Sequence, residues 1–167
     1  MVNGVSKAFA MTGWRLGYMA APKEISKACE KLQSQITSGT SSISQRASLA
    51  ALSENIEPTI EMRKAFLKRR DMMYDRLKNM AGIEVDLPDG AFYFFPRVNS
   101  FFGKKTGGIS IQNAGDMALY LLNEAHVSTV QGDAFGSDDH IRISYAASEE
   151  ELRTALNSIE LALKKLA

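Results

Sequence analysis

The last segment of the chain carries the clearest helical pattern of hydrophobic positions. Its apolar residues recur every three or four positions, which places them on one face of an α-helix: Leu152, Leu156, Ile159, Leu163 and Leu166. Ser148 and Glu151 have the S-x-x-E spacing of a capping box, in which the two side chains accept hydrogen bonds from free N–H groups at a helix start. The pattern predicts a C-terminal helix that begins after Ser148 and packs its apolar stripe on a core.

Earlier segments show the same spacing over shorter runs. The longest predicted helix covers residues 57–80, where Gly82 is expected to stop it. Its apolar positions are Met62, Phe66, Met73, Leu77 and Met80. Further helices are predicted from Lys23 through the early thirties, near 44–53 and over 112–125. The apolar face of the last of these would comprise Ala114, Met117, Ala118, Leu121, Leu122 and Ala125.

Short apolar runs bounded by glycine and proline predict strands. The first residues form the tail of one strand, and "RLGYMAAP" is a second that Pro22 stops. The stretch 82–98 predicts two strands around a Pro-Asp-Gly turn, with residues 91–95 as a buried strand. "VSTVQ" and "HIRISYA" complete the set.

These elements suggest a leading segment, a long helix and a compact α+β unit. A strand, a short strand and two helices cannot close a sheet, so the remaining strands of the leading segment are expected in sequence not present here. We therefore divide the chain at residues 1–56, 57–80 and 81–167.

Composition excludes several classes of protein. The 167 residues are 45% hydrophobic and 23% charged, and 20 basic against 19 acidic residues give a net charge of +1 that does not favour nucleic acid. Without a roughly 20-residue apolar run or a signal peptide, a cytoplasmic protein that spans no membrane is expected. Cys29 is the single cysteine, and His126 and His140 form no ligand-spaced pair, so neither a disulfide nor a metal site is expected.

The candidate chemistry lies in "SKAFAMTGWRLGY", residues 6–18. A lysine amine becomes nucleophilic where cations or desolvation lower its pKa, and an arginine fork suits a phosphate. We expect Gly13 to turn the backbone so that Lys7 and Arg15 face one pocket. Spacing alone leaves open that both are simply solvated loop residues.

Two basic stretches offer nucleotide or nucleic-acid binding as an alternative. "GKKTGG" at 103–108 lacks the order of a phosphate-binding loop and is interpreted as a flexible connection. "RKAFLKRR" at 63–70 lies on the long helix beside Glu61, Asp71 and Asp75, and it is interpreted as a solvated face.

Residues 6–18 resemble the signature of the fold type I aminotransferases that use pyridoxal 5'-phosphate (PLP), the aspartate aminotransferase family. Further similar motifs follow in the family's order: "QSQITSGTSSISQRA" at 33–47, "PDGAFYFFP" at 88–96, "VSTVQGDAFG" at 127–136 and "HIRISYAAS" at 140–148. The resemblance implies the C-terminal part of that α/β fold: the end of the large PLP-binding domain, a connecting helix and a small α+β domain.

The resemblance also implies roles at the cofactor. Lys7 would form the Schiff base with PLP and carry a proton between substrate and cofactor, and Arg15 would hold the phosphate. Thr37 and Ser38 would reach across a homodimer interface toward the partner's cofactor phosphate. Gly4 stands where some branches of the family have a phosphate-binding serine.

At the substrate, the resemblance implies that Arg142 clamps the α-carboxylate of the amino acid. Phe92 would lie near the substrate, although "AFYFF" by itself is more typical of a core strand. No residue is expected to bind a metal.

The implied reaction moves an amino group from an L-amino acid, with aspartate favoured, to a 2-oxo acid such as 2-oxoglutarate. Family contacts to the pyridine nitrogen lie before the lysine motif, so the fragment alone is expected to be inactive. A non-catalytic aminotransferase-like effector domain is the alternative, although no helix-turn-helix is visible.

Overall fold

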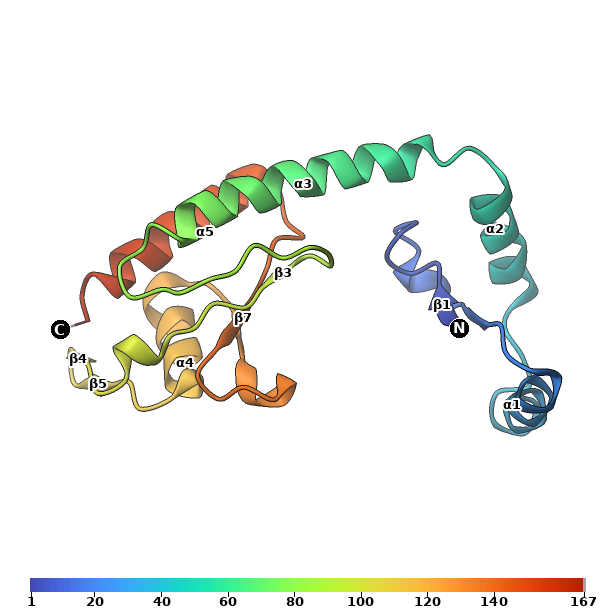
Figure 1. Ribbon diagram of the computed structural model, residues 1–167, viewed down its shortest axis with the longest axis horizontal. Coiled ribbons are helices and arrows are strands. Elements are labelled where there is room, and N and C mark those ends of the chain that lie inside the picture. Colours follow the sequence, from blue (N-terminus) through green and yellow to red (C-terminus); the bar gives the residue numbers. More distant parts are fainter. Residues whose placement is uncertain (167) are drawn as a thin grey trace. The chain divides into compact units, whose positions relative to one another are not determined.

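The computed structural model describes residues 1–166 and contains helices, short strands and 3₁₀ turns (Figure 1). The helices are α1 (Lys23–Ile36), α2 (Ser42–Ser53), α3 (Glu57–Leu77), α4 (Ala114–Ala125) and α5 (Glu149–Leu163). The strands are β1 (Val2–Gly4), β2 (Gly17–Met19), β3 (Tyr93–Phe94), β4 (Lys105–Thr106), β5 (Ile109–Ser110), β6 (Val130–Gln131) and β7 (Ile141–Ser144). The 3₁₀ turns are η1 (Thr12–Trp14), η2 (Asn99–Phe101) and η3 (Gly132–Phe135).

Packing divides the chain into two compact units, which we call unit 1 (Met1–Arg63) and unit 2 (from Lys64 onward). The boundary between them falls inside α3. The three-part division at residues 56 and 80 stays a prediction.

Unit 1 is built on an antiparallel pair of strands, β1 and β2. Gly4 lies opposite Gly17, and a Cβ atom at Gly4 would come within 3.1 Å of the Leu16 carbonyl oxygen. The close approach explains a glycine at this position. The buried apolar side chains of this unit are Val5 and Met11.

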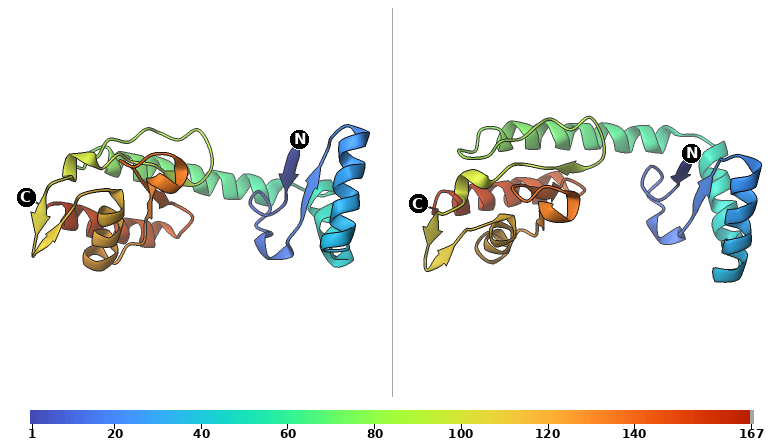
Figure 2. Two further views of the ribbon diagram at one scale, coloured as in Figure 1. Left: turned by 90° about the horizontal axis from the view of Figure 1, so that it is seen from below. Right: turned by 60° about the horizontal axis from the view of Figure 1, so that its bottom comes forward.

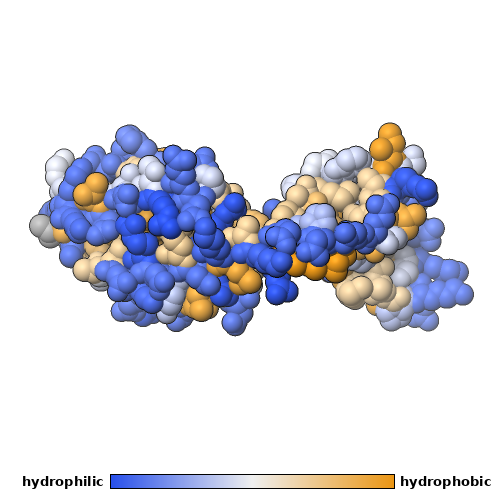
Figure 3. Space-filling view, turned by 90° about the horizontal axis from the view of Figure 1, so that it is seen from above, coloured by the Kyte–Doolittle hydropathy of each residue, from blue (hydrophilic) through white to orange (hydrophobic). Residues whose placement is uncertain are grey.

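Helix α1 buries none of its residues, and its apolar side chains Ile25, Leu32 and Ile36 are exposed. Helix α2 similarly exposes Ile43 and Leu49. On the face drawn in Figure 3, orange hydrophobic atoms reach the surface of unit 1. The unit is therefore a scaffold of local elements with very little core of its own.

Unit 2 has an antiparallel sheet in the order β3-β7-β6, with helices packed around it. Phe94 pairs with Ile143, and Val130 pairs with Arg142. The C-terminal half of α3 and α5 lie side by side (Figures 1 and 2), where Arg76 donates to Glu160 at 3.1 Å. The contiguous hydrophobic core cluster of the described residues lies in this unit.

The predicted C-terminal helix is confirmed. Ser148 accepts from the Glu151 N–H at 3.1 Å, and the Glu151 carboxylate accepts from the Ser148 N–H at 2.9 Å. Hydrogen bonding from Ser148, through its side chain first and its backbone N–H second, lowers the pKa of the Glu151 carboxyl. All five residues of the predicted apolar stripe are buried.

The predicted pair of strands around the Pro-Asp-Gly turn is present only in part. Within residues 82–98, only Tyr93–Phe94 forms a strand, and Glu84 meets Arg97 in an isolated bridge instead. Ala91 adopts a left-handed conformation with φ of 62°, which interrupts the run expected to be one buried strand over 91–95. The loop is therefore wide and not a tight two-residue turn.

One position of the predicted α4 face is also wrong. Leu122 is 47% exposed, whereas Tyr120 is buried and its hydroxyl donates to the Ala162 carbonyl oxygen at 2.8 Å. The contact with α5 rotates the buried face of α4 toward Tyr120. Burial raises the pKa of this phenol.

Residues 1–166 include no helix with the length and apolar character needed to cross a bilayer. Their His, Cys, Asp and Glu side chains form no group of three or more that could hold a metal ion.

Candidate active site

Lys7 lies in a tight turn directly after β1. The Phe9 N–H donates to the Val5 carbonyl at 3.3 Å, and the Ala10 N–H donates to the Lys7 carbonyl at 3.2 Å. Val5 before the turn is fully buried, and Met11 after it is nearly so. These two anchors fix the loop while the Lys7 side chain is exposed.

Arg15 ends the 3₁₀ turn η1 in a left-handed conformation, with φ of 52°. Its Nη1 donates to the Thr12 carbonyl oxygen at 3.2 Å. The predicted role of Gly13 as the turning residue is wrong, because Gly13 lies inside η1 without a positive φ. Ala10 and Arg15 carry the left-handed conformations that reverse the chain.

Thr12 ties the lysine turn to the arginine, and sequence reasoning missed it. Its hydroxyl donates to the Ser6 carbonyl at 3.1 Å, while its own carbonyl accepts from Arg15. The structure therefore brings Lys7 and Arg15 onto one closed loop. Threonine's tendency to bond the nearby backbone was the available signal.

The chemistry of this loop fits PLP. A primary amine can condense with an aldehyde, and an exposed guanidinium can pair with a phosphate dianion. The close approach at Gly4 leaves little room for a side chain, so a phosphate-binding serine at this position would require the strands to shift. Arg15 is then the phosphate group's candidate partner on the loop.

Thr37 and Ser38 lie at the other end of α1, not on the Lys7 loop. Thr37 is the C-cap of α1, and its hydroxyl accepts from Gln33 Nε2. Ser38 follows in a left-handed conformation with φ of 63°. Their role toward a partner's phosphate stays a prediction.

Arg142 in β7 is half-buried between two aromatic rings of unit 2. Its guanidinium carbon lies 4.3 Å from the Tyr93 ring centre and 4.2 Å from the Phe135 ring centre. No carboxylate among residues 1–166 forms an ion pair with it. The two rings stack on the faces of the guanidinium. Its N–H groups point outward in the guanidinium plane, where a carboxylate can accept two parallel hydrogen bonds.

Phe92 follows the left-handed Ala91 and is half-buried. Its ring centre lies 4.4 Å from that of Tyr93 and 6.1 Å from that of Phe66. Tyr145 fixes this bend, because its N–H donates to the Phe92 carbonyl and its hydroxyl to the Ala91 carbonyl. Burial raises the pKa of Tyr145.

The structure thus groups Phe92 and Arg142 around Tyr93, while Lys7 and Arg15 share a loop in unit 1. Sequence reasoning missed Tyr93 and Phe135 as ring partners of Arg142. Tyr93 lies within a run that is typical of a core strand. Nothing in "GDAFG" indicates that Phe135 contacts Arg142.

Known proteins match this arrangement along nearly the whole chain. Residues 1–159 match the family described as Aminotransferase class I and II. An aspartate aminotransferase of Pinus pinaster is 51% identical over 166 residues, which cover 97% of this chain and 34% of the relative. An aspartate aminotransferase of Rhizobium meliloti (strain 1021) is 47% identical over 167 residues, which cover 99% of this chain and 41% of the relative.

Solved structures agree with the sequence matches. The aspartate aminotransferase from Rhizobium meliloti matches with a TM-score of 0.96 at 46% identity. The match covers 100% of this chain and 42% of the Rhizobium meliloti chain. An aromatic aminotransferase from Pyrococcus horikoshii OT3 has a TM-score of 0.88 at 38% identity, with coverage of 98% and 42%. The expected fold type I class is confirmed, and the chain spans about two fifths of these structures. The chain belongs to the aminotransferase class I and II family.

Proposed function

We propose that this chain supplies essential groups of a PLP-dependent aminotransferase that moves an amino group from an L-amino acid to a 2-oxo acid. The observation that carries the proposal is the state of Arg142, a half-buried guanidinium held between two rings and paired with no described carboxylate. Such a group is suited to bind the α-carboxylate of an amino acid. The family match supports the cofactor.

Lys7 and Arg15 would serve the cofactor from unit 1. When bound, PLP withdraws electrons from the substrate Cα and so weakens its C–H bond. The Lys7 amine would hold the cofactor at rest, and once the substrate amine had replaced it, the free amine would move the proton from Cα to the cofactor C4′. Arg15 binds the phosphate, and the hydrogen bonds of Thr12 keep both side chains on one rigid loop.

Arg142 and Phe92 would serve the substrate from unit 2. Arg142 fixes the carboxylate and thereby the orientation of the Cα–H bond, while Phe92 offers an apolar contact. Relatives named aspartate aminotransferase support aspartate as the donor. The acceptor 2-oxoglutarate belongs to the same proposal. Action as a homodimer in the cytoplasm, with Thr37 and Ser38 directed at the partner's phosphate, belongs to the same proposal.

A chimera tests the proposal with this chain's own residues. The chain replaces the matching 41% of the Rhizobium meliloti aspartate aminotransferase, and turnover of aspartate with 2-oxoglutarate is measured. We expect activity that Lys7→Ala abolishes. We expect Arg142→Lys to lower kcat/KM about ten- to a hundredfold, because one fork of charged hydrogen bonds is lost.

The controls separate the alternatives. The 167-residue chain alone should show no turnover, since it spans only about two fifths of its relatives. In the contrary case, the chimera folds and binds amino acid but turns over substrate equally slowly with Lys7 and with Lys7→Ala. That result would contradict the proposed enzyme activity and favour an effector domain. Turnover by the chain alone at the rate of the relative would contradict the expected inactivity.

A further inference from the structure

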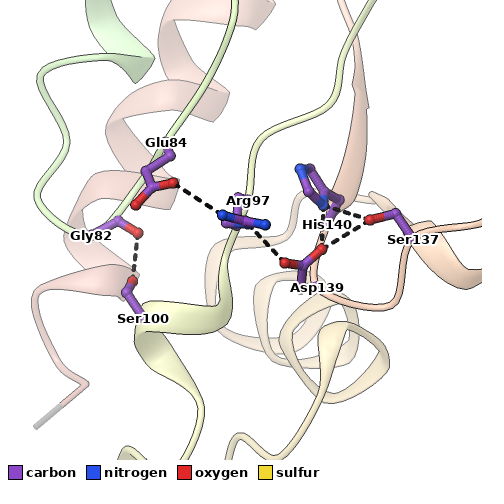
Figure 4. Close-up of polar contacts among 7 residues, drawn as sticks. All are labelled: Gly82, Glu84, Arg97, Ser100, Ser137, Asp139 and His140. Atoms are coloured by element: carbon purple, nitrogen blue, oxygen red, sulfur yellow. Dashed lines mark hydrogen bonds and ion pairs between the residues drawn. The ribbon is translucent and has the colours of Figure 1, made fainter.

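A polar cluster lies at the start of β7 (Figure 4). Its members are Glu84, Arg97, Ser137, Asp139 and His140. The Asp139 carboxylate accepts from Arg97 Nε at 2.7 Å through one oxygen. Its other oxygen accepts from Ser137 Oγ at 2.9 Å and contacts His140 Nδ1 at 2.5 Å.

This cluster is not a hydrolytic triad. In a triad the acid and the nucleophile contact different ring nitrogens of the histidine. Here Ser137 Oγ lies 2.7 Å from the same Nδ1 that contacts Asp139, so no relay of a proton across the ring is possible. The hydrogen bond from Ser137 is the largest cause of the lowered pKa of Asp139, followed by the bond to His140. An ionised carboxylate only accepts, which places the hydrogen on Nδ1 and fixes the ring plane of His140.

The fixed imidazole continues into an aromatic stack. Phe95 lies parallel to His140, with ring centres 4.8 Å apart and planes at 15°. Phe135 meets Phe95 edge-on, with centres 6.2 Å apart and planes at 86°. The Arg142 guanidinium lies on Phe135 at 4.2 Å. Each ring thus restricts the rotation of its neighbour, from His140 through Phe95 and Phe135 to Arg142.

The turn that carries Phe135 packs too closely to move independently of this stack. The Gly132 N–H donates to the His140 carbonyl at 2.8 Å, and its carbonyl accepts from the Ser137 N–H at 3.1 Å. A Cβ at Gly132 would lie 2.6 Å from the His140 oxygen and 3.0 Å from the Phe95 ring. The backbone of η3 is therefore fixed between Phe95 and His140.

We propose that His140, oriented by Asp139, is a positioning residue that acts through Phe95 and Phe135 to hold the Arg142 guanidinium ready for a carboxylate. This rests on the proposed function for the role of Arg142. The geometry itself does not depend on that role.

The test uses NMR of the 167-residue chain and the side-chain Nε–H signal of Arg142. A guanidinium stacked on ring faces gives an upfield-shifted proton, and Phe135→Leu should remove the part that Phe135 contributes. His140→Ala should move the signal in the same direction. His140→Phe keeps a ring against Phe95 but loses the hydrogen bond to Asp139, so it should restore the signal only in part. His126→Asn changes the other histidine, which is exposed at the C-cap of α4, and should leave the signal unchanged.

Maleate then probes carboxylate binding through the same signal. We expect about tenfold weaker binding for Phe135→Leu, as loss of one cation–π contact implies, and a smaller loss for His140→Ala. An unchanged Arg142 signal in a folded His140→Ala chain would overturn the positioning role. A signal that responds to His140→Ala and to its rescue, but never to maleate, would uphold the positioning and overturn the proposed function of Arg142.

Discussion

Unit 1 and unit 2 carry different parts of the proposed chemistry, and different kinds of contact hold the residues in place. Unit 1 holds Lys7 and Arg15 on a loop closed by local hydrogen bonds and anchored by two buried side chains. Unit 2 holds Arg142 on a sheet whose neighbours come from distant parts of the sequence and pack on a continuous core. Local hydrogen bonds thus hold the proposed amine, whereas the guanidinium of Arg142 depends on contacts between distant parts of the sequence.

Truncation of a core side chain should give the largest contrast between the units. Leu156→Ala empties a fully buried site in α5 and should reduce the free energy of unfolding by about 2–5 kcal/mol. Leu32→Ala in α1, where the side chain is 62% exposed, should change it by about 0.5 kcal/mol or less. Urea unfolding followed by far-ultraviolet circular dichroism, which reports the helices of both units, measures both. Equal losses would contradict the difference in core between the units.

Two glycines sharpen the comparison with changes of opposite sign. Gly132→Ala would drive a Cβ to 2.3 Å from the Ser137 carbonyl oxygen and should destabilise unit 2 by about 1–3 kcal/mol. Gly13→Ala meets no atom within 4 Å and no positive φ, so it should stabilise by up to about 1 kcal/mol through the unfolded chain. Thermal unfolding of the two variants provides the measurement. A destabilised Gly13→Ala chain would restore Gly13 as the turning residue.

Helix capping offers a matched pair of serines. Ser148→Ala removes the capping box of α5 and should reduce the free energy of unfolding by about 0.5–2 kcal/mol. Ser41 is the N-cap of α2 but makes no side-chain cap hydrogen bond, so Ser41→Ala should have a smaller effect. Urea titration of both variants checks the order, and a larger loss at Ser41 would contradict the observed caps.

The smallest expected effect is an acid-dependent loss of stability at Glu149. Hydrogen bonds from Lys68 at 2.7 Å and Arg153 at 2.8 Å lower the pKa of this carboxyl from 4.5 to about 2. Its ionised form stabilises the fold above pH 4.5, and that contribution disappears as the pH falls toward 2. Unfolding measured across this range should be less pH-dependent in Glu149→Gln, and an identical pH profile would refute the role of the ion pairs.

Local signals predicted the fold where they were sufficient. The cap at Ser148 and the stripe through Leu156 both depend on residues within a few positions of each other, and both are confirmed. The hairpin prediction over residues 82–98 is confirmed only at Tyr93–Phe94, because the bend at Ala91 involves the hydroxyl of Tyr145, 54 residues away. No pattern within the hairpin sequence reports that contact.

The same distinction applies to the candidate site. Lys7 and Arg15 lie eight positions apart in one motif, so their shared loop could be predicted even though Gly13 was assigned the wrong part. The rings around Arg142 could not be predicted, because Tyr93 and Phe135 approach it only after β3, β7 and β6 have paired. Contacts between neighbouring strands can be predicted only when the pairing register of those strands is known.

The claim that Lys7 and Arg15 form one cofactor-binding loop can be tested by reductive labelling. The 167-residue chain is incubated with PLP, reduced with borohydride, and mapped by mass spectrometry. We predict that Lys7 is labelled ahead of the exposed α1 lysines Lys23 and Lys27, and that Arg15→Ala removes this preference. Equal labelling of Lys7, Lys23 and Lys27, unaffected by Arg15→Ala, would contradict the claim.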